Sequence, residues 1–167
     1  MGAGYRMKKE DKTNVMRVLD QKKVNYVPHV FDPELAIAGM EVAALLNEAP
    51  ERCFKTLVTI GRSGKYHVFM VPVCNELNLK AAAKAVSEKS IEMLPQKELL
   101  PLTGYIHGGC SPIGMKKLFN TVIDSSAFDY ETIFFSAGKL GHQVEVNPED
   151  IKKVIPITSA VISDKNA

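Results

Sequence analysis

Most of the residues in this chain whose types and spacing suggest chemistry lie in one glycine-rich stretch, TGYIHGGCSPIGMKK at residues 103–117. Four of its fifteen residues are glycine, and it ends in the pair Lys116 and Lys117. Glycine weakens both helices and strands, and it permits sharp turns and close approach of the backbone to a ligand. The stretch therefore predicts an ordered loop that bends around something or binds it.

Two common motifs of this kind do not fit its spacing. A P-loop needs lysine directly after its second glycine, but Met115 follows Gly114 and the first lysine comes one position late. A nucleophile elbow has the pattern GxSxG, but Pro112 follows Ser111 and the next glycine is one residue too far away. The loop is therefore predicted to use neither of these two chemistries.

A thiol–imidazole pair is also conceivable in this loop, because Cys110 follows His107 by three residues. The sequence does not fix their geometry, and a free cysteine is more often an inert packing residue than a nucleophile. The three cysteines and four histidines of the chain contain no CxxC, HxH or HxxxH pair. Neither a disulfide framework nor a metal site is predicted, and no cofactor is expected.

Lys55 is the other unusual residue, because it stands in an apolar, strand-forming run. Side chains alternate between the two faces of a strand. Lys55 and Leu57 are therefore expected on one face, and Phe54, Thr56 and Val58 on the other. Lysine is rarely buried unless it is paired. Lys55 is accordingly either a functional cation or a charge that protects a sheet edge.

The elements that must position these residues follow from hydrophobic periodicity and from helix and turn signals. Thr13 and Asn78 are expected N-caps, Pro28 limits its strand to an edge, and Pro101 is expected to end a short helix. Helices are predicted at residues 13–22, 35–47, 78–86 and 95–100, with another starting at Asn147. Strands are predicted at residues 24–31, 53–60, 66–73, 121–124, 132–136, 143–146 and 154–157, with hairpin chemistry at 61–65.

This order of elements is not a regular βα alternation. It predicts a single α+β domain with a mixed, mostly antiparallel sheet, curled or closed into a barrel, and flanking helices. Residues 13–160 are expected to form this domain. Residues 1–12 are expected to be an N-terminal tail or residues added to the native chain, and residues 161–167 a C-terminal tail.

Composition excludes several classes of protein. The chain has 167 residues, 46% of them hydrophobic and 24% charged, which is ordinary for a globular protein. No apolar run approaches the roughly 18 residues that a transmembrane helix needs, so no membrane is expected and a cytoplasmic location is predicted. The net charge of +2 does not by itself require a nucleic-acid partner.

Seven short stretches together are more specific than any one of them: FKTL at 54–57, VPV at 71–73, ELNLK at 76–80, TGY at 103–105, GGCSPIG at 108–114, ID at 123–124 and SAG at 136–138. With these stretches, the chain resembles the YbaK/EbsC family of aminoacyl-tRNA deacylases, which is related to the editing domain of bacterial prolyl-tRNA synthetases. The resemblance runs from about Thr13 to Ile155. Within the family, the chain is most similar to the Cys-tRNA(Pro) deacylase branch.

The resemblance implies a free-standing hydrolase that clears tRNA(Pro) mischarged with cysteine. Cysteine and proline are similar in size, so one binding pocket separates them by only a few kcal/mol and a second sieve is useful. In this branch the cysteine thiol of the substrate attacks its own ester carbonyl and leaves as a cyclic thiolactone. The implied partners are the acceptor end of mischarged tRNA(Pro) and prolyl-tRNA synthetase.

The resemblance also implies roles for particular residues. Lys55 would position the substrate and stabilise negative charge at the reacting carbonyl or at the terminal ribose–phosphate. The backbone N–H groups of Gly108 and Gly109 would complete an oxyanion site. Asp124 would either orient Lys55 or a hydroxyl, or simply cap a strand end. The predicted substrate-lining residues are Phe31, Thr56, Tyr105, Ser111, Pro112, Asp124, Ser136, Ala137 and Gly138, and Lys116 and Lys117 are predicted to contact tRNA phosphates.

Two positions depart from the family pattern. Phe31 stands where relatives often have tyrosine, and Leu140 stands where relatives typically have arginine. These departures favour a competing hypothesis, a non-catalytic module that binds a small ligand or a partner. A third hypothesis keeps the deacylase chemistry but changes the substrate to Ala-tRNA(Pro) or another small mischarged amino acid.

Overall fold

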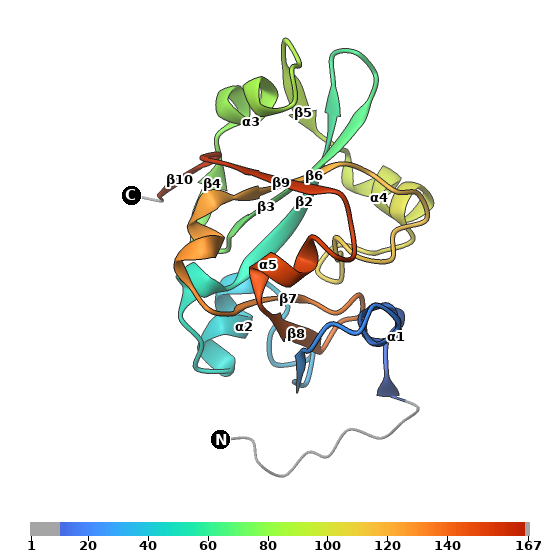
Figure 1. Ribbon diagram of the computed structural model, residues 1–167, viewed down its shortest axis with the longest axis vertical. Helices are drawn as coiled ribbons and strands as arrows, with labels where there is room; N and C mark the ends of the chain where they lie inside the picture. The colour runs from blue at the N-terminus through green and yellow to red at the C-terminus, as the bar shows by residue number, and fades with distance from the viewer. Residues whose placement is uncertain (1–10, 166–167) are drawn as a thin grey trace.

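The longest pair of strands, β2 (Phe54–Gly61) and β3 (Tyr66–Pro72), forms an antiparallel hairpin at the centre of a five-stranded sheet (Figure 1). The computed structural model describes residues 11–165. The strand order is β5-β2-β3-β6-β9, with β5 at Ile91–Met93, β6 at Thr121–Asp124 and β9 at Ile157–Ala160. The β3–β6 and β6–β9 pairs are parallel, whereas β5–β2 is antiparallel.

A second, three-stranded antiparallel sheet lies against the lower half of β2. It has the order β1-β8-β7, with β1 at Val27–Val30, β8 at His142–Val146 and β7 at Ile133–Ser136. A single bridge between Cys53 and Phe134 links the two sheets. On the same edge of β2, β5 pairs only with residues 59–61. The part of β2 that contains Lys55 and Thr56 therefore lies between the two places where this edge is covered.

Helices pack around these sheets; those after Thr13 and Asn78 begin at the predicted caps, whereas the helix predicted at residues 35–47 begins only at Gly39. In α1 (Asn14–Gln21), the Thr13 hydroxyl accepts from the Met16 N–H, and in α3 (Leu79–Ala85), the Asn78 side chain accepts from the Ala81 N–H. The other helices are α2 at Gly39–Leu45, α4 at Gln96–Thr103, α5 at Pro148–Ile151 and the 3-10 helices η2 at Pro50–Arg52 and η3 at Ser125–Asp129. Within residues 11–165, no helix has the length and apolar character needed to cross a membrane.

The central hairpin is buried on both faces. On one face, Phe54 and Met70 join a core that includes α1 and β7. On the other face, Phe69 and Val71 pack with residues of α3 and β6. Successive residues of β2 consequently point into two different parts of the molecule.

The predicted α+β class and the mixed, mostly antiparallel sheet are confirmed. Pro101 does not end its helix, which was predicted wrongly: α4 runs on to Thr103 and ends at Gly104, whose φ of 87° is a left-handed helix cap. The last predicted strand is also shifted, because Ile155 still donates its N–H to the Ile151 carbonyl and β9 begins only at Ile157.

The prediction of a tail at residues 161–167 is wrong for its middle part. Residues 163–165 form β10 (Ser163–Lys165), which pairs antiparallel with β4 (Asn75–Leu77), a strand that was not predicted. Ile162 is fully buried in the core beside α3. Of the predicted N-terminal tail, residues 1–10 lie outside the described residues.

Glu88, just after α3, holds the tip of the β2–β3 hairpin in place. Its carboxylate accepts hydrogen bonds from the Ser63 hydroxyl at 2.6 Å and the Ser63 N–H at 3.1 Å, and lies 2.7 Å from the Nε2 of His67. The Ser63 hydroxyl and His67 lower the pKa of Glu88 from 4.5 to about 2. The ionised carboxylate thus contributes to holding the hairpin.

We expect Glu88→Gln to lower the unfolding midpoint at neutral pH and to reduce the loss of stability as pH falls from about 4.5 to about 2. The folded-state pKa is the lower one, so the unfolded chain binds more protons in this window and stability rises with pH across it. Urea unfolding at pH 3, 5 and 7 measures the effect, with Glu98→Gln on the exposed surface of α4 as control. An unchanged pH dependence in Glu88→Gln would contradict the assignment.

Candidate functional site

A cavity of about 560 Å³ opens beside the part of β2 that β5 leaves uncovered. Four segments surround it: the chain from β1 into α2, the start of β2, the glycine-rich loop, and the β7–β8 turn. Its volume is typical of small-molecule sites. The lining residues are Phe31, Ile37, Ala38, Gly39, Met40, Glu41, Val42, Cys53, Phe54, Lys55, Thr56, Leu57, Val73, Leu99, His107, Gly108, Cys110, Phe135, Ser136, Lys139, Gly141, His142 and Gln143.

Thr56 shares a face of β2 with Phe54 and Val58, as the strand alternation predicts, and the structure places this face toward the glycine-rich loop. Its neighbours on the same face, Phe54 and Val58, are buried, and Val58 packs in one cluster with Cys110. The Thr56 hydroxyl is buried and has no hydrogen-bond partner within the described part of the chain. An unpaired buried hydroxyl is costly, so it is a group whose hydrogen bond a substrate could complete.

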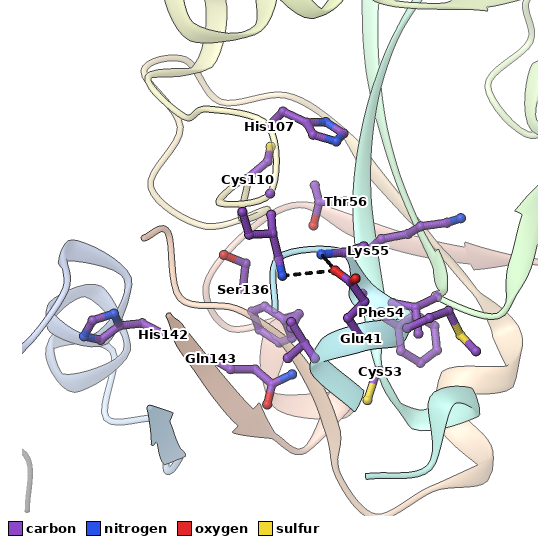
Figure 2. Close-up of a pocket in the computed structure, with 18 of the residues that line it drawn as sticks. Glu41, Cys53, Phe54, Lys55, Thr56, His107, Cys110, Ser136, His142 and Gln143 are labelled. Carbon is purple, nitrogen blue, oxygen red and sulfur yellow. Dashed lines mark hydrogen bonds between the residues drawn. The ribbon is translucent and has the colours of Figure 1, made fainter. Parts of the chain in front are cut away.

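The Lys55 side chain lies on the face of β2 opposite to Thr56. Lys55 stands opposite Val71 on the second face of the hairpin, and Figure 2 shows its side chain extending away from Thr56 and Cys110. Burial and the charge of Glu51 raise the pKa of the Cys74 thiol, and the positive charge of Lys55 partly opposes that rise. The Lys55 amine makes no hydrogen bond or ion pair with any of residues 11–165. It is a cation at the edge of the cavity that remains available to an anion.

The contacts that hold the glycine-rich loop in place lie on the side of the loop that faces away from the cavity. The Tyr105 hydroxyl donates to the Ile113 carbonyl, and its ring lies against Gly114 and Gly138, where a side-chain Cβ would come within 2.7 and 2.9 Å of Tyr105. Both glycines have positive φ, 81° and 89°. Tyr105 therefore fixes the loop against the β7–β8 turn.

The two glycines predicted to form an oxyanion site differ in the structure. Gly108 lines the cavity with φ 89°, and its N–H is not donated to any group within residues 11–165. Gly109 is buried, and its N–H already donates to the Ile106 carbonyl at 3.0 Å. The prediction that both N–H groups are available to an oxyanion is therefore wrong for Gly109, and only the Gly108 N–H remains without an acceptor within residues 11–165.

The buried thiols are not set up as nucleophiles. Burial raises the pKa of the Cys110 thiol to about 12. Burial and the nearby Glu48 carboxylate also raise the pKa of Cys53, whose thiol donates to Glu48 at 3.3 Å. The thiolate is the reactive form of cysteine, so both groups are inert near neutral pH.

Within residues 11–165, no hydroxyl or thiol of the cavity is paired with a histidine, and the thiol that does contact a carboxylate, Cys53, has a raised pKa. The Nδ1 of His142 instead lies 3.2 Å from the Leu140 carbonyl. The Ser136 hydroxyl accepts from the Gly138 N–H at 3.1 Å. The Cys110–His107 pair considered from the sequence is not formed either. The cavity can bind and orient a substrate, but it presents no activated nucleophile of its own.

Five of the predicted site residues line the cavity, namely Phe31, Lys55, Thr56, Gly108 and Ser136. Tyr105, Ser111, Pro112, Ala137 and Gly138 do not; they support its walls from behind. Ser111 and Ala137 are fully buried, and the Ser111 hydroxyl accepts from the Ile113 N–H at 3.4 Å.

Asp124 is also outside the cavity. Its carboxylate accepts from the Ser126 hydroxyl at 2.6 Å and from the Ile162 N–H at 3.0 Å. It therefore caps the end of β6 and ties down the approach to β10, and the alternative of orienting Lys55 is not realised. Lys116 donates to the Pro101 carbonyl at 3.4 Å, near the end of α4, whereas Lys117 is exposed.

The polar lining residues that were not predicted include Glu41, Lys139 and Gln143, besides His142 described above. Glu41 accepts from the Ile37 and Ala38 N–H groups at 3.4 and 3.1 Å (Figure 2). Lys139 is exposed, and Gln143 is a buried amide whose oxygen has no partner within the described residues. The sequence carries no clear signal for Gln143, because three of the five residues of β8, HQVEV, are polar.

Gln143 lies beside a second buried polar group. Burial raises the pKa of the Glu48 carboxyl, while the Cys53 thiol and the Gln143 amide oppose that rise by hydrogen bonding. One oxygen of Glu48 also lacks a hydrogen-bond partner within the described residues. Figure 2 shows the Gln143 side chain extending from β8 in the direction of Cys53. This side of the cavity is therefore rich in hydrogen-bond acceptors.

Comparison with known proteins gives a consistent result. The model of the aminoacyl-tRNA editing domain family matches residues 25–154. A curated relative from Enterococcus faecalis, named as a candidate Cys-tRNA(Pro)/Cys-tRNA(Cys) deacylase, EbsC, is 46% identical over 145 residues, which are 86% of this chain and 88% of the relative.

Solved structures share the fold. The crystal structure of the hypothetical protein APE2540 has a TM-score of 0.82 at 19% identity and covers 90% of this chain and 99% of its own. A candidate trans-editing enzyme for prolyl-tRNA synthetase has a TM-score of 0.77 at 20% identity, with 92% and 95% covered. At these identities, the likeness concerns the fold alone.

The inertness of Cys110 can be tested directly. At pH 8, a thiol with a pKa of about 12 is ionised in roughly 1 molecule in 10,000, so we expect alkylation of Cys110 in the folded protein to be more than about a thousandfold slower than that of free cysteine. Peptide mass spectrometry after iodoacetamide treatment measures this, with the partly exposed Cys74 as the internal reference. All three cysteines should react alike in denaturant. Rapid labelling of Cys110 in the native protein would contradict the buried, protonated state.

Proposed function

The chain belongs to the aminoacyl-tRNA editing domain family, as the resemblance indicated, and from this premise we propose that it is a trans-acting deacylase that removes cysteine from mischarged tRNA(Pro). One observation carries the choice of chemistry: the cavity holds no activated nucleophile within the described residues, because its buried thiols have raised pKa values and no histidine contacts its hydroxyls. A substrate that brings its own nucleophile suits such a site.

In the proposed reaction, the thiol sulfur of the cysteinyl ester attacks the carbonyl carbon of the same residue. The S–C bond forms, the C–O bond to the ribose breaks, and the thiol proton passes to the departing ribose oxygen. The products are a cyclic thiolactone and deacylated tRNA. Well-oriented intramolecular reactions gain roughly 7–11 kcal/mol relative to their bimolecular counterparts, so the protein mainly has to fold the aminoacyl group and hold it.

The residues of the cavity divide this work. The free N–H of Gly108 stabilises the oxyanion that develops at the carbonyl. The unpaired oxygens of Thr56 and Gln143 accept hydrogen bonds from the substrate, whose α-ammonium group is a donor. Lys55 points away from Thr56 and has no partner within residues 11–165, which favours contact with the terminal ribose–phosphate over contact with the carbonyl.

The same proposal includes prolyl-tRNA synthetase as a partner. The net charge is only +2, and Lys116 is occupied at the end of α4. The chain therefore offers little that could distinguish one tRNA body from another, and its own binding to tRNA is expected to be weak and sensitive to salt. A synthetase that retains tRNA(Pro) nearby supplies the missing discrimination.

The first test is deacylation of Cys-tRNA(Pro) and Ala-tRNA(Pro). We expect the wild type to clear Cys-tRNA(Pro), and Lys55→Ala to lower kcat/KM by about 10- to 100-fold, as for loss of one charged hydrogen bond. Lys65→Ala, at the exposed hairpin tip, is the matched control. If the wild type clears neither substrate, the chain is a binding module; if Lys55→Ala is fully active, the role of Lys55 is wrong.

The second test separates cyclisation from direct hydrolysis. S-methylcysteinyl-tRNA(Pro) has the same ester but no free thiol, so we expect its deacylation to be at least about 100-fold slower than that of Cys-tRNA(Pro). Rapid quenching and mass spectrometry should detect the thiolactone before it hydrolyses to cysteine. Efficient clearance of the methylated substrate, or of Ala-tRNA(Pro), would instead indicate that water is the nucleophile.

A further inference from the structure

Three loops bring apolar side chains together at the mouth of the cavity. A Cβ atom placed on Gly108 would lie 2.9 Å from Cγ2 of Ile37 and 3.2 Å from Cδ2 of Leu140. One placed on Gly109 would lie 3.7 Å from Cγ1 of Ile106 and 3.5 Å from the backbone N of Leu140. Ile37, Ile106 and Leu140 thus surround the two glycines; we call these three side chains the rim.

The rim is exposed although it is apolar. Ile37 and Ile106 are 49% and 48% exposed, and Leu140 is half-buried. Ile37 and Gly108 line the cavity, so the rim is continuous with the site rather than remote from it. Lys139, directly before Leu140, also lines the cavity, is exposed, and makes no hydrogen bond or ion pair with any of residues 11–165.

We propose that the rim is the platform for the terminal adenine of the aminoacyl-tRNA, with Lys139 contacting the adjoining phosphate. The inference rests on the proposed function. An aminoacyl ester is attached to the ribose that carries this base, so a base whose ester enters the cavity must lie within one sugar's length of its mouth. Nucleobases stack on flat apolar surfaces as well as on aromatic rings.

The size and charge of the surface favour a base over a protein. Protein interfaces bury about 800 Å² on each partner, which three side chains cannot provide. An apolar surface beside an ammonium group that has no partner within residues 11–165 matches a nucleotide, which joins an apolar face to an anion. Leu140 thereby acquires a function of its own: the leucine that stands at the expected arginine position extends the platform.

The test compares two substrates. Cys-tRNA(Pro) carries the terminal base, whereas cysteine ethyl ester has the same ester chemistry without it. For Ile106→Ala and Leu140→Ala, which do not line the cavity itself, we expect kcat/KM for Cys-tRNA(Pro) to fall by about 5- to 100-fold through KM, the effect of losing one stacked base, and kcat/KM for the ethyl ester to stay within twofold. Leu100→Ala, equally apolar and 51% exposed on α4, is the control.

A binding measurement makes the inference independent of catalysis. Adenosine 5′-monophosphate should shift the methyl NMR signals of Ile37, Ile106 and Leu140, whereas ribose 5-phosphate should not. Lys139→Gln should weaken binding of the nucleotide but not of adenosine. If the wild type fails to deacylate Cys-tRNA(Pro) while the nucleotide still shifts the rim methyls, the proposed function fails and the platform stands.

Three outcomes overturn the platform. One is an equal loss with both substrates, which means that the variants deform the cavity. Another is no loss with either substrate and no methyl shift with the nucleotide. The last is normal activity of the isolated variants combined with lost stimulation by prolyl-tRNA synthetase, which would make the rim a protein-docking surface.

Discussion

Strand β2 is the element on which the site depends, because it lies in a sheet that is buried on both faces. The period of two in a strand means that adjacent residues cannot serve the same side. Thr56 consequently faces the glycine-rich loop, while Lys55 faces the side of α3 and Cys74. In the proposed function, the cation and the hydroxyl are neighbours in the chain but contact different ends of the substrate. The gap between the bridge to Phe134 and the short pairing with β5 leaves room for that substrate at the strand edge.

The elements with strong local signals could be predicted from the sequence. The caps at Thr13 and Asn78, the hairpin between β2 and β3, and the helix after Asn147 all follow from local chemistry, and all are present. The errors arise where tertiary contacts decide. The local sequence does not indicate that Ser163 pairs with Leu77, because this strand pairing depends on the burial of Ile162 beside α3. Pro101 was expected to stop its helix, but the last turn closes through the Gly104 N–H, which donates to Leu100.

Prediction of the site was limited in the same way, because local signals are visible in the sequence and tertiary contacts are not. The glycine-rich loop and Lys55 were found because glycine density and a lysine in an apolar strand are visible in one dimension, whereas Thr56 was predicted only from the family resemblance. Which residues face the cavity and which hold it from behind is not visible. Tyr105 contacts Gly138, which is 33 residues away in the chain. Both carboxylate oxygens of Asp124 accept hydrogen bonds, one from Ser126 in the following turn and one from Ile162. Lys139 enters the site because the β7–β8 turn packs against the glycine-rich loop and the segment after β1, and Gln143 enters it from β8.

The burial of Cys110 has a further consequence for the thiol chemistry proposed for this pocket. A thiolactone is an acylating agent, and a cysteinyl substrate can exchange with disulfides, so a reactive protein thiol beside either of them would be modified with use. A neighbour that stays protonated takes part in neither reaction. In the proposed reaction, the apolar surroundings of Cys110 thus keep this thiol from being acylated by the thiolactone product.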